Sequence, residues 1–381
     1  MTNYDYIDNR GRSGLINQTP TLTHRQARRL SSRQRDEQMK NIEIEKDPEL
    51  ESLIAKCKKK GLKFGLALGS GSARGMAHIG VIQVLEAYHI PIDMIAGTSI
   101  GSVVGSLYAA GASIKQLKEA ALSMKWSKTI SLMDPTIPHS GLLSGNRVEK
   151  HLKELFLNDK TFDDLKISFA TVATDVDTGA KVILNQGNVL KAVRASLSIP
   201  GIFAPVKYHD YYLVDGGVVD PVPVDLLQQM GANIIIAVSL AIKRPHTITL
   251  MINKETGALE EIASSDKFQI KKEGRLKLRV VEKIASLVNK EKDSLKKKID
   301  EVKVKLESPN IFEVLAQSIY IMEAEITSQC LKGADVVIAP FGIEKVSLLE
   351  FNKAEALIEG GIKATLEALY HIKKTIKQKL K

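Results

Sequence analysis

The residue with the clearest capacity for covalent chemistry is Ser99, which lies between two glycines in the sequence Gly97-Thr-Ser-Ile-Gly101. An apolar run ends at Gly97, and small and apolar residues at helical spacing continue to Gly111. This pattern is typical of a nucleophile elbow, in which a strand ends, a tight turn exposes a serine and a helix begins at once. The helix N-terminus favours negative charge beside that serine. The five-residue pattern alone is equally compatible with a Gly/Ser turn that carries no chemistry.

The residues before Ser99 predict the unit that positions it. The segment 63–68 is typical of a buried strand; a glycine-rich turn (69–75), an apolar helix and a second strand at 92–97 follow. A right-handed β–α–β unit of this kind predicts a parallel sheet covered by helices. Arg74 stands where a dinucleotide-binding G-x-G-x-x-G turn needs its last glycine. The backbone N–H groups of such a turn can instead stabilise an oxyanion beside a nucleophile.

The remaining pattern predicts four segments. Residues 1–61 are expected to form a polar, basic N-terminal arm and helix, and residues 62–241 an α/β core. Residues 242–309 are rich in lysine, with apolar residues at heptad spacing over 278–306, and predict a charged, amphipathic helical insertion. That insertion could self-associate as a coiled coil or lie on a bilayer. Residues 310–381 are expected to resume the core and to end in a basic helix.

A second candidate for chemistry is Asp215, which follows an apolar run and precedes two glycines. It could act as a base or be an ordinary turn residue. A free aspartate has a pKa of about 3.9, so burial would have to raise that pKa for a base. The histidines after Asp215 are His246, in the insertion, and His371, in the basic tail, so a Ser–Asp–His triad is not favoured. His78 could face the site or be an ordinary residue of its helix.

Three motifs in order resemble the patatin-like phospholipase family, in the bacterial branch related to the catalytic domain of neuropathy target esterase. They are G-S-G-S-A-R-G at 69–75, G-T-S-I-G at 97–101 and D-G-G at 215–217, supported by R-A-S-L-S-I-P-G-I-F-A-P at 194–205. The resemblance covers about 62–240 and 312–370. It implies a three-layer α/β/α patatin-like fold with a mainly parallel central sheet.

The resemblance also implies the site residues. Ser99 would be the nucleophile and Asp215 the base of a dyad without histidine. The oxyanion loop would comprise Gly69, Ser70, Gly71, Ser72, Ala73, Arg74 and Gly75, with Gly97 and Gly101 in the elbow and Gly216 and Gly217 in the D-G-G motif. Many family members have glycine where this sequence has Ser70 and Ser72.

The function that follows from the resemblance is that of a serine lipid acyl hydrolase, which cleaves fatty-acyl esters or phospholipids through an acyl-enzyme. Two alternatives stay open, a lipid acyltransferase and a membrane- or partner-binding module on the same fold. No cofactor and no metal are expected, because Asp175 and Asp177 are typical of a loop and have no further ligands at fixed spacing.

The composition and the charge distribution indicate which partners and which cellular compartment to expect. The chain has 381 residues, two cysteines and a net charge of +10; residues 61–240 are neutral, while 1–60, 241–310 and 363–381 carry +4, +6 and +5. There is no disulfide framework, no secretory signal pattern and no apolar run of about 18 residues or more. We therefore expect a cytoplasmic protein whose basic amphipathic segments contact the inner face of the membrane. Nucleic acid is not favoured as a partner, because the basic segments lack interleaved aromatic residues.

Overall fold

The computed structural model describes residues 47–124, 131–132, 134, 143–242, 249–252, 259–262, 311–348 and 350–381. Asp47–Lys381 forms one compact unit. Residues 1–46 of the predicted arm and the heptad segment 278–306 lie outside the described residues, so the predictions for them stay predictions. The boundaries between the four predicted segments likewise stay predictions.

The centre of the unit is a mixed sheet in the order β10-β7-β1-β2-β3-β6-β5, with β4 paired to β3. The parallel strands are β1 (Phe64–Leu68), β2 (Met94–Thr98), β3 (Ser168–Asp175), β7 (Ile234–Val238) and β10 (Val336–Ile338). The antiparallel strands are β4 (Lys181–Leu184), β5 (Val206–Tyr208) and β6 (Tyr211–Asp215). The predicted α/β fold with a mostly parallel sheet is therefore confirmed.

The helices of the unit are α3 (Pro48–Lys59), α4 (Ala77–Ala87), α5 (Ile100–Ala109), α6 (Ile114–Ser123), α8 (Asn146–Leu152), α9 (Val189–Ser196), α10 (Val224–Gln229), α13 (Ile311–Cys330) and α14 (Ala354–Leu380). Their ends follow local chemistry. Asp47 caps α3 by accepting a hydrogen bond from Leu50 N at 3.0 Å, with Pro48 at the first helical position. Ser113 and Gln116 form a capping box at the start of α6.

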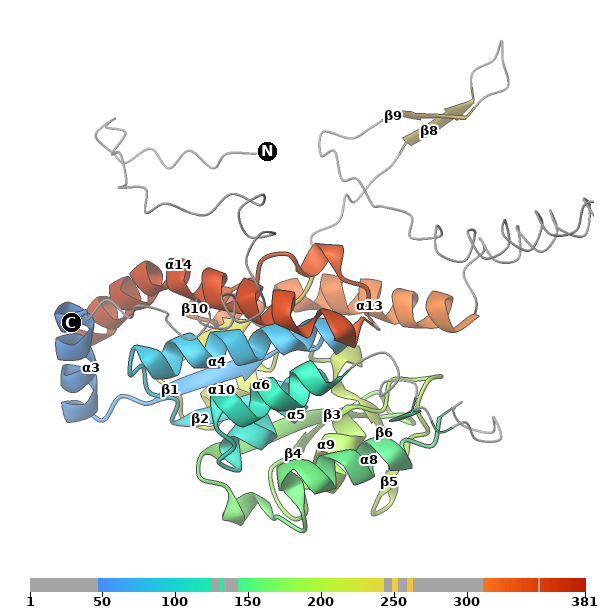
Figure 1. Ribbon diagram of the computed structural model, residues 1–381, viewed down its shortest axis with the longest axis horizontal. Coiled ribbons are helices and arrows are strands. Elements are labelled where there is room, and N and C mark those ends of the chain that lie inside the picture. The colour runs from blue at the N-terminus through green and yellow to red at the C-terminus, as the bar shows by residue number, and fades with distance from the viewer. Residues whose placement is uncertain are drawn as a thin grey trace, which may run out of the picture. The chain divides into compact units, whose positions relative to one another are not determined.

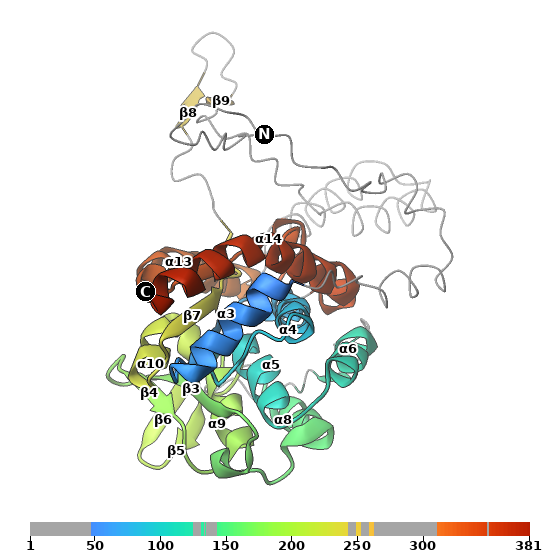
Figure 2. The same cartoon turned by 90° about the vertical axis from the view of Figure 1, so that its left-hand side faces the viewer.

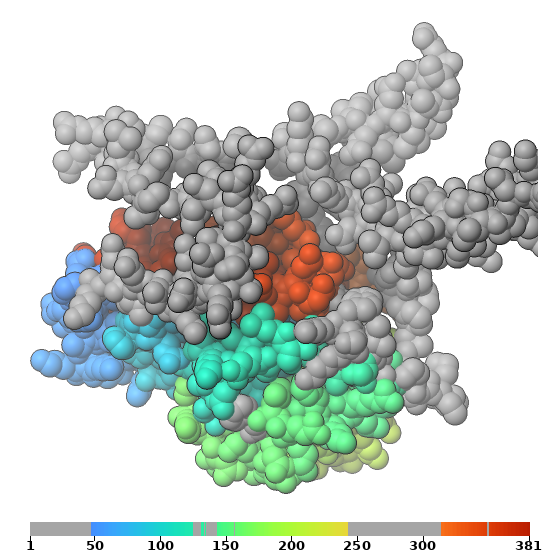
Figure 3. Space-filling view, viewed as in Figure 1, coloured from blue at the N-terminus to red at the C-terminus, as the bar shows by residue number. Residues whose placement is uncertain are grey.

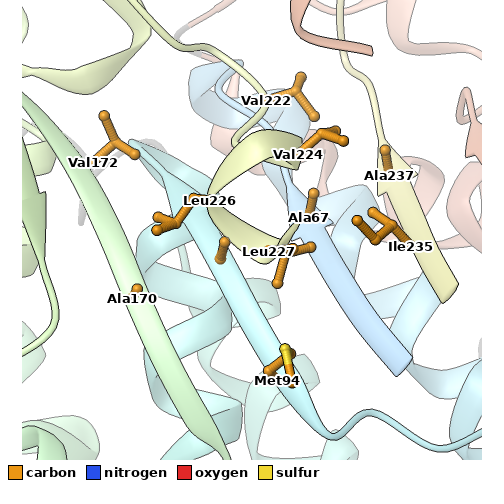
Figure 4. Packing of buried hydrophobic residues seen from close by; sticks show 11 residues of the cluster. Ala67, Met94, Ala170, Val172, Val222, Val224, Leu226, Leu227, Ile235 and Ala237 are labelled. Atoms are coloured by element: carbon orange, nitrogen blue, oxygen red, sulfur yellow. The ribbon is translucent and has the colours of Figure 1, made fainter. Parts of the chain in front are cut away.

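Helices cover both faces of the sheet, and the two-residue period of the strands decides which side chains they meet. On one face Ala67, Met94 and Val172 pack with Leu226 and Leu227 of α10 (Figure 4). On the other face α5 lies over β2 and β3, and the Cα of Gly105 approaches Ile95, Phe169 and Leu68. Neighbouring residues of one strand thus pack against helices on opposite faces of the sheet. This is the three-layer α/β/α arrangement that was expected.

The long α14 lies beside α4 (Figure 1), and in the turned view α3 lies near the end of α14 (Figure 2). In the space-filling view α14, in orange and red, borders the blue to cyan surface of α4 and α6 (Figure 3). Lys373 Nζ lies 2.8 Å from Asp47 Oδ2, and Lys377 Nζ lies 2.5 Å from Glu49 Oε1. The basic C-terminal helix therefore pairs with the acidic start of α3.

Four elements differ from the sequence-based expectations. Strand β5 and helix α10 were not predicted, because each is short. Strands β8 (Thr249–Ile252) and β9 (Leu259–Ile262) pair antiparallel inside the segment expected to be helical. The helical expectation is wrong for these eight residues, which pair as strands.

Candidate active site

The turn after β2 holds Ser99 in a strained backbone conformation. Its φ and ψ are 54° and −122°, and α5 begins at the next residue. Positive φ is uncommon for a residue other than glycine and costs on the order of 1–3 kcal/mol. The two flanking glycines permit the turn, because a Cβ on Gly101 would lie 2.0 Å from Leu68 O and one on Gly97 would lie 2.6 Å from Gly101 O. The elbow geometry expected for Ser99 is present.

Replacing Gly101 by alanine is expected to destabilise the fold by about 1–3 kcal/mol and to displace Ser99, because the backbone of β1 cannot move away cheaply. Urea unfolding and ester hydrolysis would measure the two effects. Gly105→Ala, on the same helix, is the matched control, because its Cβ would meet side-chain atoms at 3.0 Å or more. Equal losses in the two variants would contradict the close-packing argument.

The structure brings the two residues of the predicted dyad together. Ser99 Oγ donates a hydrogen bond to Asp215 Oδ2 at 2.6 Å, and Gly217 N donates to Asp215 Oδ1 at 2.8 Å. The side chains come from adjoining regions because β6 pairs with β3, which pairs with β2. Both residues are buried, with exposures of 3% and 1%. Burial raises the pKa of Asp215 to about 7 against the lowering effect of the two hydrogen bonds.

Residues of the 194–205 motif brace the backbone of this pair. Ser99 N donates to Ser196 Oγ at 2.9 Å, and Asp215 N donates to Ser198 O at 2.9 Å. The buried Arg194 donates through Nη1 to Ser198 Oγ at 2.6 Å. The sequence pattern of this motif indicated no role for Ser196. A buried hydroxyl in a helix ending at a candidate site was the available signal.

The glycine-rich turn, from Gly69 through Gly75, begins where β1 ends. No acceptor within the described part of the chain takes the N–H groups of Gly71 and Ser72, whereas Ala73 N donates to Leu348 O at 3.0 Å. A Cβ on Gly71 would lie 2.8 Å from Leu240 Cβ, and Ser72 has a φ of 52°. Two unbonded donors on a constrained backbone suit the binding of an oxygen anion.

The side chains of this turn are fixed from the C-terminal part of the chain. Ser72 Oγ donates to Leu348 O at 2.6 Å, and Arg74 Nε donates to Val346 O at 2.9 Å. The Arg74 guanidinium also lies 4.7 Å from the ring centroid of Tyr320 on α13. Ser72 therefore anchors the turn through its side chain, while its backbone N–H stays available.

His78 and the acidic pair at 175–177 support structure at this end of the sheet. His78 is fully buried, its Nε2 lies 2.8 Å from Gly69 O, and burial lowers its pKa to about 4. It therefore braces the start of the glycine-rich turn as a neutral donor. Asp175 accepts from Thr178 Oγ1 at 2.5 Å within a turn, as expected for a loop residue. Among the described residues, no group of three His, Cys, Asp or Glu could hold a metal ion.

Glu323 of α13, which the sequence pattern did not indicate, also lies at this site and is buried with 8% exposure. Its Oε2 accepts from Ser70 Oγ at 3.0 Å, and its Oε1 lies 2.3 Å from where a Cβ of Gly217 would stand. Burial and the nearby Asp215 carboxyl raise its pKa to about 8. The sequence signal was weak, because charged residues are common on helices.

The fold and the site together define a class of domain. Residues 66–227 match the family model described as patatin-like phospholipase, so this part of the chain is a patatin-like phospholipase domain. The resemblance seen in the sequence is thereby confirmed. Within the described residues, no helix has the length and apolar character needed to cross a membrane.

Several known proteins are similar to this chain over the matched region. The chain is 38% identical over 178 residues to an uncharacterized NTE family protein of Mycobacterium tuberculosis, covering 47% of this chain and 49% of that protein. It is 33% identical over 187 residues to human patatin-like phospholipase domain-containing protein 6 and 34% identical over 187 residues to Drosophila melanogaster neuropathy target esterase sws. Those matches cover 47% of this chain and 13% of each relative.

The matched region thus spans about half of the mycobacterial relative and a small part of the animal relatives. A solved structure, VipD from Legionella pneumophila, aligns with a TM-score of 0.30 and 14% identity over 48% of this chain and 50% of that chain. A likeness that weak carries no weight for fold or function.

Proposed function

We propose that this protein is a serine lipid acyl hydrolase that cleaves fatty-acyl esters, of the phospholipase, lysophospholipase or esterase type, through an acyl-enzyme at Ser99. The observation that carries the proposal is the 2.6 Å hydrogen bond from Ser99 Oγ to the buried carboxylate of Asp215, inside a patatin-like phospholipase domain. A strained serine at a helix N-terminus, paired with a base, is the arrangement of an activated nucleophile.

In the first half of the proposed reaction, Ser99 Oγ attacks the ester carbonyl carbon while its proton passes to Asp215. A pKa of about 7 suits this transfer, because the carboxyl can accept a proton at neutral pH and return it to the leaving alcohol. In the second half a water gives its proton to Asp215 and attacks the acyl carbonyl. The fatty acid then leaves, and the proton on Asp215 returns to Ser99.

The negative charge of each tetrahedral intermediate would be bound by the turn that follows β1. The N–H groups of Gly71 and Ser72 are the proposed donors, since neither bonds to an acceptor in the described part of the chain. The N-terminus of α5, which begins directly after Ser99, adds a favourable dipole. Ser70, Ala73, Arg74 and Gly75 would hold the turn in place.

The lipid substrate is proposed from the family. Contact with a membrane through the basic segments, and self-association through residues 278–306, stay predictions because those segments lie largely outside the described residues. Two lysines of the C-terminal helix, Lys373 and Lys377, are already paired with Asp47 and Glu49. That helix therefore offers an anionic surface less charge than its sequence alone indicates.

Covalent labelling tests the proposal directly. An alkyl fluorophosphonate is expected to bind one equivalent per folded chain, and peptide mass spectrometry is expected to place the adduct on Ser99. Lysophospholipid should yield free fatty acid, whereas acyl-glycerol formed with added glycerol would favour the transferase alternative. A folded protein that takes up no label, or is labelled only elsewhere, would contradict the proposal.

A further inference from the structure

We propose that Glu323 is a positioning residue of the candidate active site. Glu323 and Asp215 together hold one proton at neutral pH, and this proton lies on Glu323. Asp215 is therefore ionised and can act as the base. Glu323 also anchors Ser70 of the glycine-rich turn. This inference rests on the proposed function, because it assumes that Asp215 takes the proton of Ser99.

The position of Glu323 in the fold is the first argument. It lies on α13, outside the matched residues 66–227, and its side chain reaches both halves of the site. One carboxylate oxygen, Oε2, accepts from Ser70 Oγ at 3.0 Å. The other, Oε1, lies against the Cα of Gly217, whose backbone N–H donates to Asp215. Glu323 thus joins the turn that would bind the oxyanion to the motif that holds the base.

The closeness of the two carboxyls is the second argument. A Cβ built on Gly217 would lie 2.3 Å from Glu323 Oε1 and 3.1 Å from Asp215 Oδ1. Both oxygens therefore crowd one point, and any side chain at that point would clash. This gives a physical reason for glycine at the last position of the D-G-G motif, because only glycine leaves room for a second carboxyl beside the first.

Two buried carboxyls at this separation do not ionise together easily, since each charge disfavours the other in a poorly solvated site. Burial and the Asp215 carboxyl raise the pKa of Glu323 to about 8, while burial raises that of Asp215 to about 7. The pair therefore holds one proton at neutral pH. Asp215 accepts two hydrogen bonds, from Ser99 Oγ and Gly217 N, whereas Glu323 accepts one, from Ser70 Oγ, and this difference favours the negative charge on Asp215 and the proton on Glu323. Asp215 is then ionised and hydrogen-bonded to Ser99.

The other charged or titratable groups near the two carboxyls have partners of their own. Arg74 lies over the ring of Tyr320, one helical turn before Glu323, and donates through Nε to Val346 O. His78 is held neutral by burial and bonds to Gly69 O. Asp220 follows the D-G-G motif and pairs with Lys181, at 3.3 Å from its Nζ.

Ionisation of Glu323 would harm catalysis in two ways. A second negative charge beside the dyad opposes the developing oxyanion, and it also favours protonated Asp215. The pH profile of kcat/KM is therefore expected to rise as Asp215 ionises and to fall as Glu323 ionises. A purely structural Glu323 would not impose the falling limb.

The test is the pH profile of kcat/KM for a p-nitrophenyl acyl ester, from pH 5 to 10. Wild type is expected to rise near pH 7 and to fall near pH 8, the pKa values of Asp215 and Glu323. Glu323→Gln keeps a neutral side chain and should retain the rising limb but lose the falling one. When kcat/KM at pH 9 is expressed as a fraction of each protein's own maximum, the fraction for Glu323→Gln should be about tenfold larger than that for wild type. Glu325→Gln, an exposed change on the same helix, should leave the profile unchanged.

A second variant addresses the case in which Glu323→Gln does not fold. The hydrogen bond from Ser70 lowers the pKa of Glu323, so Ser70→Ala should move the falling limb to higher pH. If the falling limb stays in place in either variant that folds, and the activity still depends on Ser99, the inference is overturned but the proposed function is not. Activity that survives Ser99→Ala would instead overturn the proposed function.

Discussion

Replacing Ser99 by alanine is expected to lower kcat/KM for fatty-acyl esters on the order of 10⁴-fold or more, to the background rate. The hydroxyl is the group that would form the acyl-enzyme, and no other hydroxyl in the described part of the chain donates to the carboxylate of Asp215, because Thr174 Oγ1 donates to its backbone carbonyl instead. Hydrolysis of a p-nitrophenyl ester and fatty-acid release from lysophospholipid would both measure the loss. Activity within tenfold of wild type would remove Ser99 from the mechanism.

A comparison of two inactive variants isolates the strain at this position. Ser99→Gly and Ser99→Ala both lack the hydroxyl, but only glycine adopts a φ of 54° with a ψ of −122° at little cost. Ser99→Gly is therefore expected to be the more stable by about 1 kcal/mol, after allowance for the greater freedom of glycine in the unfolded chain. Equal melting temperatures would show that the elbow is not strained.

The local features of this site were accessible from the sequence because each depends on a few adjacent residues. The elbow follows from glycines on both sides of Ser99, and the glycine-rich turn follows from a strand that runs into small residues. The juxtaposition of Ser99 and Asp215 depends instead on β6 pairing with β3. Hydrophobic periodicity does not predict that pairing, so it came from the resemblance.

The contacts made by Glu323 and Ser196 could not be predicted from the sequence. Ser70 and Glu323 are 253 residues apart in sequence, and Ser99 and Ser196 are 97 apart. A buried carboxyl becomes identifiable only when the fold has removed its water, because its neighbours in sequence resemble those of any helical glutamate. Residues that support the site are thus harder to predict from the sequence than the residues that would react.

The C-terminal part of the chain completes the site without contributing a residue to the proposed reaction steps. Leu348, Val346 and Glu323 hold the glycine-rich turn through Ser72, Arg74 and Ser70. These contacts come from outside the matched residues 66–227. The geometry of the turn therefore depends on α13 and the segment after β10 being folded against it.

Replacing Asp215 by asparagine is expected to lower kcat/KM by about 10²–10⁴-fold. Asparagine keeps the shape of the side chain and can bond to Gly217 N and to the Ser99 hydroxyl, but it cannot accept the serine proton. Fluorophosphonate labelling of Ser99 should slow in parallel with hydrolysis. Unchanged rates in both measurements would exclude Asp215 as the base.

The same substitution is expected to change how stability depends on pH. Burial raises the pKa of Asp215 from an unfolded value of 3.8 to about 7, so the folded state binds more protons than the unfolded state between those values. The free energy of unfolding therefore falls as the pH rises through this window. Asp215→Asn removes this contribution and should match wild type near pH 4 but exceed it at pH 8 by on the order of 4 kcal/mol.

Urea unfolding at pH 4 to 8 measures this difference, and Asp177→Asn, in an exposed turn, is the matched control. The control should keep the wild-type slope. Glu323 adds a slope of the same sign, because its pKa is also raised, so Asp215→Asn should reduce the slope without abolishing it. A wild-type protein whose stability rises from pH 5 to 8 would mean that the buried pair is not held protonated, and the proposed origin of the active base would then be wrong.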